Sequence, residues 1–177
     1  MEARYKAGTV PVREFSDFYV GTLTRRTVDD WQAQRQQFLA DEIIPRIPQS
    51  ARDLISKHQD QHELVAITTA TNRFITELTA LHLNVAHLIA TDAEIVDGIF
   101  SGRAEGQLNM REGKVVRLHA WLAARGSSRS DFMITAYSDS INDLPLLLAA
   151  DTPVAVNPDD PLRQWALAGG HTILNLR

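Results

Sequence analysis

Apolar side chains near the start of the chain recur at spacings of about three and four residues, the period of an α-helix. The stripe, which includes one arginine, consists of Val28, Trp31, Arg35, Phe38, Leu39 and Ile43. The residues around it are mostly charged or Gln, so the helix would have one apolar face. Pro45 and Pro48 then interrupt the pattern. The sequence therefore predicts a helical part over residues 1–47 and a second part over residues 48–177.

From residue 51 onward, short continuous apolar runs alternate with helical patterns. The runs predict strands at 64–67, 85–90, 94–96, 99–100, 132–137, 153–156 and 172–176, with a hairpin turn at Asp97-Gly98. Helices are predicted between them, at 51–58, up to about residue 80, and at 114–124, 144–150 and 161–168. Apolar strands separated by helices are typical of a mostly parallel sheet that is covered on both faces. The predicted fold class is α/β.

Ligands of open α/β sheets bind at the carboxyl ends of the strands, so the polar residues that follow each apolar run are the informative ones. Thr69 follows the run 64–68 and is predicted to lie directly before a helix. Its hydroxyl, beside the free amides of a helix N-terminus, suits a phosphate oxygen. For a single threonine, however, a plain helix cap is the commoner interpretation.

The most polar strand end is the loop Ser138-Asp139-Ser140-Ile141-Asn142-Asp143, which follows the run 132–137. Carboxylate oxygens in one strand-to-helix turn suit Mg²⁺, which prefers oxygen ligands. A turn or cap is the alternative, since Asp, Ser and Asn are common there. A cap needs one such residue, whereas this loop has five polar residues in six. We therefore favour a functional site.

Lys114 is predicted to begin a helix, where its charge is slightly unfavourable with the helix dipole. Its ammonium group could neutralise phosphate oxygens or a developing negative charge. Surface lysines are common, and on its own Lys114 is better explained as one of them.

Three segments together resemble a known family. Residues 66–72, 111–116 and 137–145 are similar to the second, third and fourth motifs of the haloacid dehalogenase superfamily, in its phosphoserine-phosphatase-like branch, which includes histidinol-phosphate phosphatases. The resemblance extends over essentially the whole chain. It implies a Rossmann-like parallel sheet flanked by helices in residues 48–177, and the remnant of a small helical cap domain in residues 1–47.

The resemblance also implies roles for individual residues. Thr69, Ala70, Lys114 and Asn142 would bind the phosphate, with Thr69 and Lys114 taking part in catalysis. Asp139 and Asp143 would form the Mg²⁺ site. The expected reaction is hydrolysis of a small phosphorylated metabolite, such as phosphoserine or histidinol phosphate, through an aspartyl-phosphate.

The first motif of the family, an apolar strand that ends in Asp-x-Asp-x-Thr and carries the nucleophile, has no match among the 177 residues. The segment 15–23 contains Asp17, but Tyr19 stands where the second aspartate belongs and no apolar strand precedes it. Since this strand is central in the family's sheet, its absence is expected to leave unpaired strand edges. We therefore expect these residues alone to be inactive, and a partner that supplies a strand, or self-association, to cover the edges. The alternative is a truncated, inactive remnant that binds phosphate or metal.

Composition and charge exclude several kinds of site and of binding partner. The chain has no cysteine, which excludes disulfides and thiolate metal sites, and its formal net charge of −4 gives no electrostatic basis for binding nucleic acid. No apolar run is long enough for a membrane helix, and residues 1–6 contain no signal-peptide core. We therefore expect a cytoplasmic protein that binds neither nucleic acid nor a membrane.

Overall fold

The computed structural model describes residues 10–176 and divides the chain into two compact units, Met1–Asn109 and Met110–Arg177. Both units combine helices with a three-stranded sheet, which confirms the α/β fold class. The sequence predicted a boundary between a cap and a core after residue 47, whereas the two compact units divide after Asn109. The boundary between cap and core stays a prediction. Residues 1–9 of the expected cap lie outside the described part of the chain.

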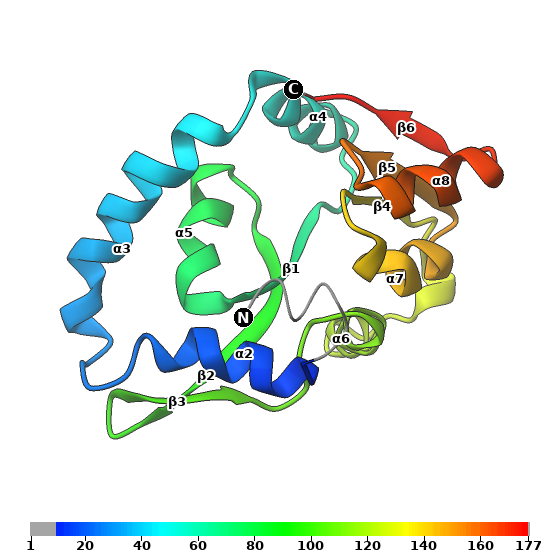
Figure 1. The fold of residues 1–177 in the computed structure, drawn as a ribbon. Coiled ribbons are helices and arrows are strands. Elements are labelled where there is room, and N and C mark those ends of the chain that lie inside the picture. Colours follow the sequence, from blue (N-terminus) through cyan, green and yellow to red (C-terminus); the bar gives the residue numbers. More distant parts are fainter. Residues whose placement is uncertain (1–9, 177) are drawn as a thin grey trace. The chain divides into compact units, whose positions relative to one another are not determined.

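The sheet of the first unit is formed by strands β1 (Ala66–Asn72), β2 (His87–Val96) and β3 (Ile99–Glu105), in that order. β1 and β2 are parallel, whereas β2 and β3 form an antiparallel hairpin. Helix α5 (Arg73–His82) packs on β1 and β2, and helix α2 (Val12–Gly21) packs mainly on β3 (Figure 1). The runs 85–90 and 94–96, predicted as separate strands, are parts of the single strand β2.

The stripe at 28–43 does not form one regular helix. It is divided among η1 (Asp29–Trp31), α3 (Gln32–Phe38) and the π-type turn η2 (Leu39–Ile43), and is followed by η3 (Ile44–Arg46) and α4 (Gln49–Asp60). Within the stripe the arginine is buried: Arg35 donates to Glu77 Oε2 at 2.8 Å and lies over the ring of Phe74. Phe38, in contrast, is 45% exposed.

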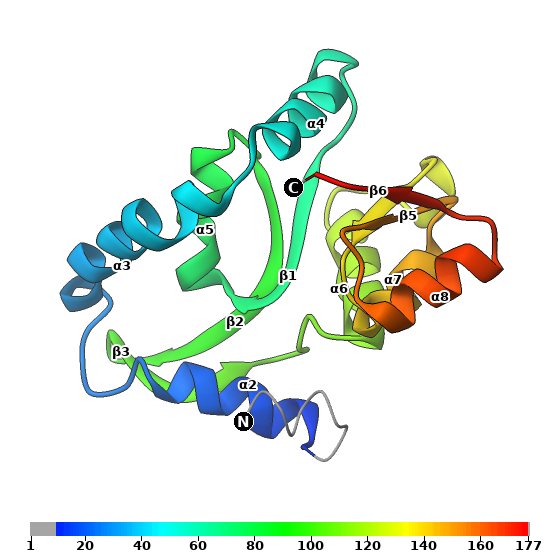
Figure 2. The same ribbon diagram turned by 45° about the horizontal axis from the view of Figure 1, so that its top comes forward.

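The second unit contains the parallel strands β4 (Thr135–Ser138), β5 (Thr152–Val156) and β6 (Thr172–Leu174), in that order. Helix α6 (Glu112–Ala123) packs on α7 (Leu144–Ala149), which contacts β4 and β5, and α8 (Asp160–Ala168) contacts β5 and β6 (Figure 2). η4 (Arg129–Asp131) and η5 (Ile141–Asp143) are single turns. The apolar core is formed by Ala136, Leu146, Leu147, Ala155, Leu162 and Ala166.

Within residues 10–176, β1 and β4 are each an edge strand of their own sheet. The expectation that an absent Asp-x-Asp-x-Thr strand leaves unpaired edges stays a prediction. No described helix is long and apolar enough to cross a membrane.

A carboxylate joins the start of β4 to the loop before β5. Asp151 Oδ2 accepts hydrogen bonds from the backbone amide of Ile134 and from Arg129 Nη2, both at 2.7 Å. The Ile134 amide, assisted by Arg129, holds the pKa of Asp151 below its ordinary value of 3.8.

We expect Asp151→Asn to lower the free energy of unfolding at pH 7, and this loss to shrink as the pH falls below 3.8. A carboxylate with a depressed pKa stabilises the fold above the unfolded-state pKa, and loses that effect as the pH falls through its folded-state value. Urea titrations between pH 7 and pH 3 would measure the difference, with exposed Asp60→Asn as the control. A difference that is constant over this pH range would contradict the prediction.

Candidate active site

The acidic loop of the second unit follows the end of β4. Ser138, the last residue of the strand, is buried, and its hydroxyl accepts from the amide of Ser140 at 3.3 Å. Ser140 caps the next turn by accepting from the amide of Asn142 at 3.3 Å, and the Asn142 side chain also donates to Ser140 Oγ, at 3.4 Å. Helix α7 then begins at Leu144, with Pro145 in its first turn. The predicted strand–loop–helix unit is confirmed, with its polar groups partly buried.

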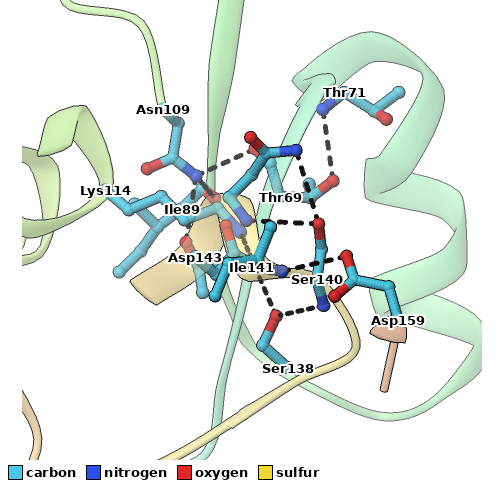
Figure 3. Close-up of polar contacts among 12 residues, drawn as sticks. Thr69, Thr71, Ile89, Asn109, Lys114, Ser138, Ser140, Ile141, Asp143 and Asp159 are labelled. Carbon is cyan, nitrogen blue, oxygen red and sulfur yellow. Dashed lines mark hydrogen bonds and ion pairs between the residues drawn. The ribbon is translucent and has the colours of Figure 1, made fainter. Parts of the chain in front are cut away.

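Lys114 and Asp143 form a shielded ion pair in this unit. Lys114 Nζ lies 2.6 Å from Asp143 Oδ2, and the Lys114 and Asp143 side chains are only 7% and 16% exposed. Ser138 Oγ donates to the same carboxylate oxygen at 2.8 Å (Figure 3). Lys114 belongs to the first turn of α6, so its ammonium reaches the acidic loop from another element. The interpretation of Lys114 as a solvated surface lysine is therefore wrong.

Asp139 differs from Asp143 in both exposure and contacts. It is exposed, and no described residue donates a hydrogen bond to its carboxylate. Its backbone carbonyl accepts from the amide of Asp159 at 2.8 Å, and Asp159 Oδ2 in turn accepts from the amide of Ile141 at 3.0 Å. Asp159 therefore connects the start of α8 to the acidic loop. The sequence analysis did not single out Asp159 and missed this connection.

The donor set fits a magnesium ion only in part. Among residues 10–176, no three His, Cys, Asp or Glu side chains are grouped so that they could hold one metal ion. Mg²⁺ usually keeps several waters and needs only one or two protein carboxylates. The open carboxylate of Asp139 suits this role, whereas one oxygen of Asp143 is already bound to Lys114 and Ser138. The assignment of Asp143 as a ligand stays a prediction.

Thr69 and Ala70 lie in the first unit, and the expected position of Thr69 at a helix N-terminus is wrong. Strand β1 continues through both residues to Asn72, and α5 begins only at Arg73. The cap is Asn72, whose side chain accepts from the amide of Ile75 at 3.1 Å. The β-branched threonines favour the extended backbone, which explains the longer strand. Thr69 Oγ1 accepts from the amide of Thr71 at 3.2 Å, where the register of β1 with β2 shifts.

Asn109 holds the end of this strand in place and was missed by the sequence interpretation. It is fully buried, and its Nδ2 donates to Thr69 O at 2.8 Å, to Ile89 O at 2.7 Å and to Thr68 Oγ1 at 3.0 Å (Figure 3). Its backbone amide donates to Thr91 Oγ1 at 3.0 Å. The Asn109 side chain thus links β1 to β2 at Thr69, one of the candidate phosphate-binding residues. A single asparagine after a strand gives no sequence signal for this role.

Comparison of the sequence with known proteins gives a family match and several relatives. A family model for haloacid dehalogenase-like hydrolases matches residues 1–148. A histidinol-phosphatase of Neisseria meningitidis serogroup C is 34% identical over 175 residues, which are 98% of this chain and 79% of that protein. The phosphoserine phosphatase SerB1 of Mycobacterium tuberculosis is 34% identical over 152 residues. These residues are 86% of this chain but only 49% of the mycobacterial protein.

Solved structures show the same fold. A protein of unknown function from Bordetella pertussis Tohama I matches with a TM-score of 0.96 and 40% identity, over 99% of this chain and 79% of that one. A phospho-aspartyl intermediate analogue of phosphoserine phosphatase matches with a TM-score of 0.70 and 16% identity, over 99% of this chain and 78% of that one. At such low identity the second match supports the fold alone. Since the family model covers most of the chain and the Neisseria relative is matched over 79% of its length, the chain belongs to the haloacid dehalogenase-like hydrolase family.

Proposed function

We propose that these residues form the phosphate- and metal-handling part of a Mg²⁺-dependent phosphomonoester phosphatase. The observation that carries the proposal is the shielded Lys114–Asp143 pair beside the open carboxylate of Asp139. A buried ammonium held in place by a carboxylate is a preorganised positive charge, which can stabilise negative charge that develops on a phosphoryl group. Relatives named histidinol-phosphatase and phosphoserine phosphatase support a small phosphorylated metabolite as the substrate class.

Different residues of this chain would bind the phosphate and the cation. Within the second unit, Lys114 would hold phosphate charge and Asn142 would contact bound phosphate from the acidic loop. Thr69 and Ala70, in strand β1 of the first unit, stay predicted phosphate-binding residues. Asp139 would be the main protein ligand of the cation, with Asp143 keeping Lys114 in place. When bound, Mg²⁺ would supply neutralisation of the phosphoryl oxygens. We also propose the cytoplasm as the location of the protein.

The nucleophile is the component that the 177 residues do not contain, because no Asp-x-Asp sequence occurs among them. We propose that turnover through an aspartyl-phosphate needs a strand ending in Asp-x-Asp-x-Thr from outside these residues. The unpaired edge of β1 or of β4 would suit such a strand from a partner. The same absence favours one alternative, an inactive remnant that binds phosphate or metal.

The test compares the 177-residue chain with a fusion that adds an apolar strand ending in Asp-x-Asp-x-Thr ahead of residue 1. Both are assayed with p-nitrophenyl phosphate, phosphoserine and histidinol phosphate in the presence of Mg²⁺. We expect turnover only from the fusion, since covalent catalysis requires the added carboxylate. Asp139→Ala should remove that turnover, whereas Asp60→Ala, at the exposed end of α4, should leave it unchanged.

Three outcomes would contradict parts of the proposal. Turnover by the unfused chain that Asp139→Ala removes would reveal a nucleophile within the present sequence. Full activity of Asp139→Ala in the fusion would show that Asp139 is not the ligand. A folded fusion that is inactive towards all three substrates would favour the remnant.

A further inference from the structure

Asp159 makes more contacts than the capping of α8 requires. Its Oδ1 accepts from the amide of Leu162 at 2.9 Å, which is an ordinary N-cap bond. Its Oδ2 accepts from the amide of Ile141 at 3.0 Å, and its own amide donates to Asp139 O at 2.8 Å. The last two bonds reach a segment 18 or more residues earlier in the chain. They hold the backbone at both ends of Ser140, directly after Asp139.

These two bonds are shorter than the loop contacts in which a serine hydroxyl accepts from an amide. Those contacts, from Ser140 N to Ser138 Oγ and from Asn142 to Ser140 Oγ, are 3.3–3.4 Å long and involve neutral groups. The bond from the Ile141 amide to Asp159 ends on a carboxylate, and bonds to an ionised acceptor are roughly twice as strong as neutral ones. Asp159 therefore holds the backbone on the carboxyl-terminal side of Asp139, from the Asp139 carbonyl to the Ile141 amide.

We infer that Asp159 is a positioning residue for the cation site: by holding Asp139 O and the Ile141 amide, it fixes the direction in which the Asp139 carboxylate points. The inference rests on the proposed function, in which Asp139 binds Mg²⁺. Asp159 itself is outside the three segments that resemble the family motifs. A residue that holds a ligand without touching the metal commonly changes metal affinity by about 10–100-fold when it is replaced.

The matched variants are Asp159→Ser and Asp160→Ser. Serine is a good N-cap, but its single short oxygen cannot serve both Leu162 and Ile141, so Asp159→Ser keeps the cap and loses the bond to the loop. Asp160 is the exposed neighbour in the first turn of α8, and Asp160→Ser removes the same charge without touching the loop. The comparison separates positioning from the general loss of one negative charge near a cation.

Two readouts on the 177-residue chain need no enzymatic activity. Amide hydrogen exchange reports the bonds at Ile141 and Leu162, and paramagnetic broadening of the Asp139 and Ser140 signals by Mn²⁺ gives an apparent Kd. For Asp159→Ser we expect faster exchange at Ile141, protection kept at Leu162, and a Kd raised about 10–100-fold. For Asp160→Ser we expect a rise of no more than about fivefold, as for a surface charge.

Each other outcome counts against the inference. Equal losses in the two variants would mean a charge effect, and an unchanged Kd in Asp159→Ser would leave Asp159 as a cap alone. If Mn²⁺ does not broaden Asp139 in the wild-type chain, the metal assignment of the proposed function fails, and the inference with it. If Asp159→Ser does not fold, Asp159→Asn keeps the side-chain shape and one acceptor oxygen, and the same comparison applies.

Discussion

Lys114→Met is expected to lower the free energy of unfolding of the second unit by about 3–5 kcal/mol, the usual cost of removing one partner of a buried ion pair. The Lys114 side chain is 7% exposed, and its loss leaves the 16% exposed Asp143 with the hydroxyl of Ser138 as its other contact. In the active fusion the same change should lower the rate about 10²–10³-fold, as for the loss of one preorganised electrostatic contact. Methionine keeps much of the aliphatic stem, so the cavity it leaves is small.

Urea titrations would measure the stability change, with Lys57→Met as the matched control. Lys57 is an exposed residue of α4, and its replacement should change the free energy of unfolding by no more than about 0.5 kcal/mol. The double variant Lys114→Met/Asp143→Leu removes both charges and should recover much of the lost stability. A loss below about 1 kcal/mol for Lys114→Met, with less than about a threefold drop in rate, would mean that the pair behaves as a surface salt bridge.

Asn109→Leu is expected to cost about 3 kcal/mol of stability in the first unit. The replacement has a similar size but leaves Thr69 O and Ile89 O without the amide that now donates to them, and each buried acceptor left unpaired costs about 1–3 kcal/mol. Asn109 is fully buried, so water cannot easily replace the lost donor. The ends of β1 and β2 should loosen first, which hydrogen exchange of the Thr69 and Ala90 amides would detect.

Gln37→Leu is the matched control, because it removes an exposed amide from α3 in the same unit. Its effect should stay within about 0.5 kcal/mol. Equal stabilities for Asn109→Leu and Gln37→Leu would show that the buried amide contributes nothing net to the fold.

The sequence by itself determined the elements whose signals are local. The run before Ser138, the polar loop and the Pro145 helix were predicted in order, and the structure has β4, η5 and α7 there. Local signals also misplaced a boundary. Thr69 was expected next to a helix, but the β-branched residues around it extend β1 to Asn72, where an asparagine cap starts α5. Boundaries of this kind depend on pairing with β2, which no local pattern contains.

The tertiary structure alone decided which polar groups meet. Lys114 and Asp143 are 29 residues apart, and Asp159 and Ile141 are 18 apart. Asn109 reaches acceptors 20 to 41 residues earlier in the chain. Sequence patterns report the period of apolar burial within one element. The contribution of a lysine, aspartate or asparagine to stability or binding depends instead on whether its side chain is shielded from water and on which partner it contacts. Both conditions are set by packing between elements, and so a residue that looks like an ordinary surface lysine or turn aspartate in the sequence gains its shielded partners only in the folded chain.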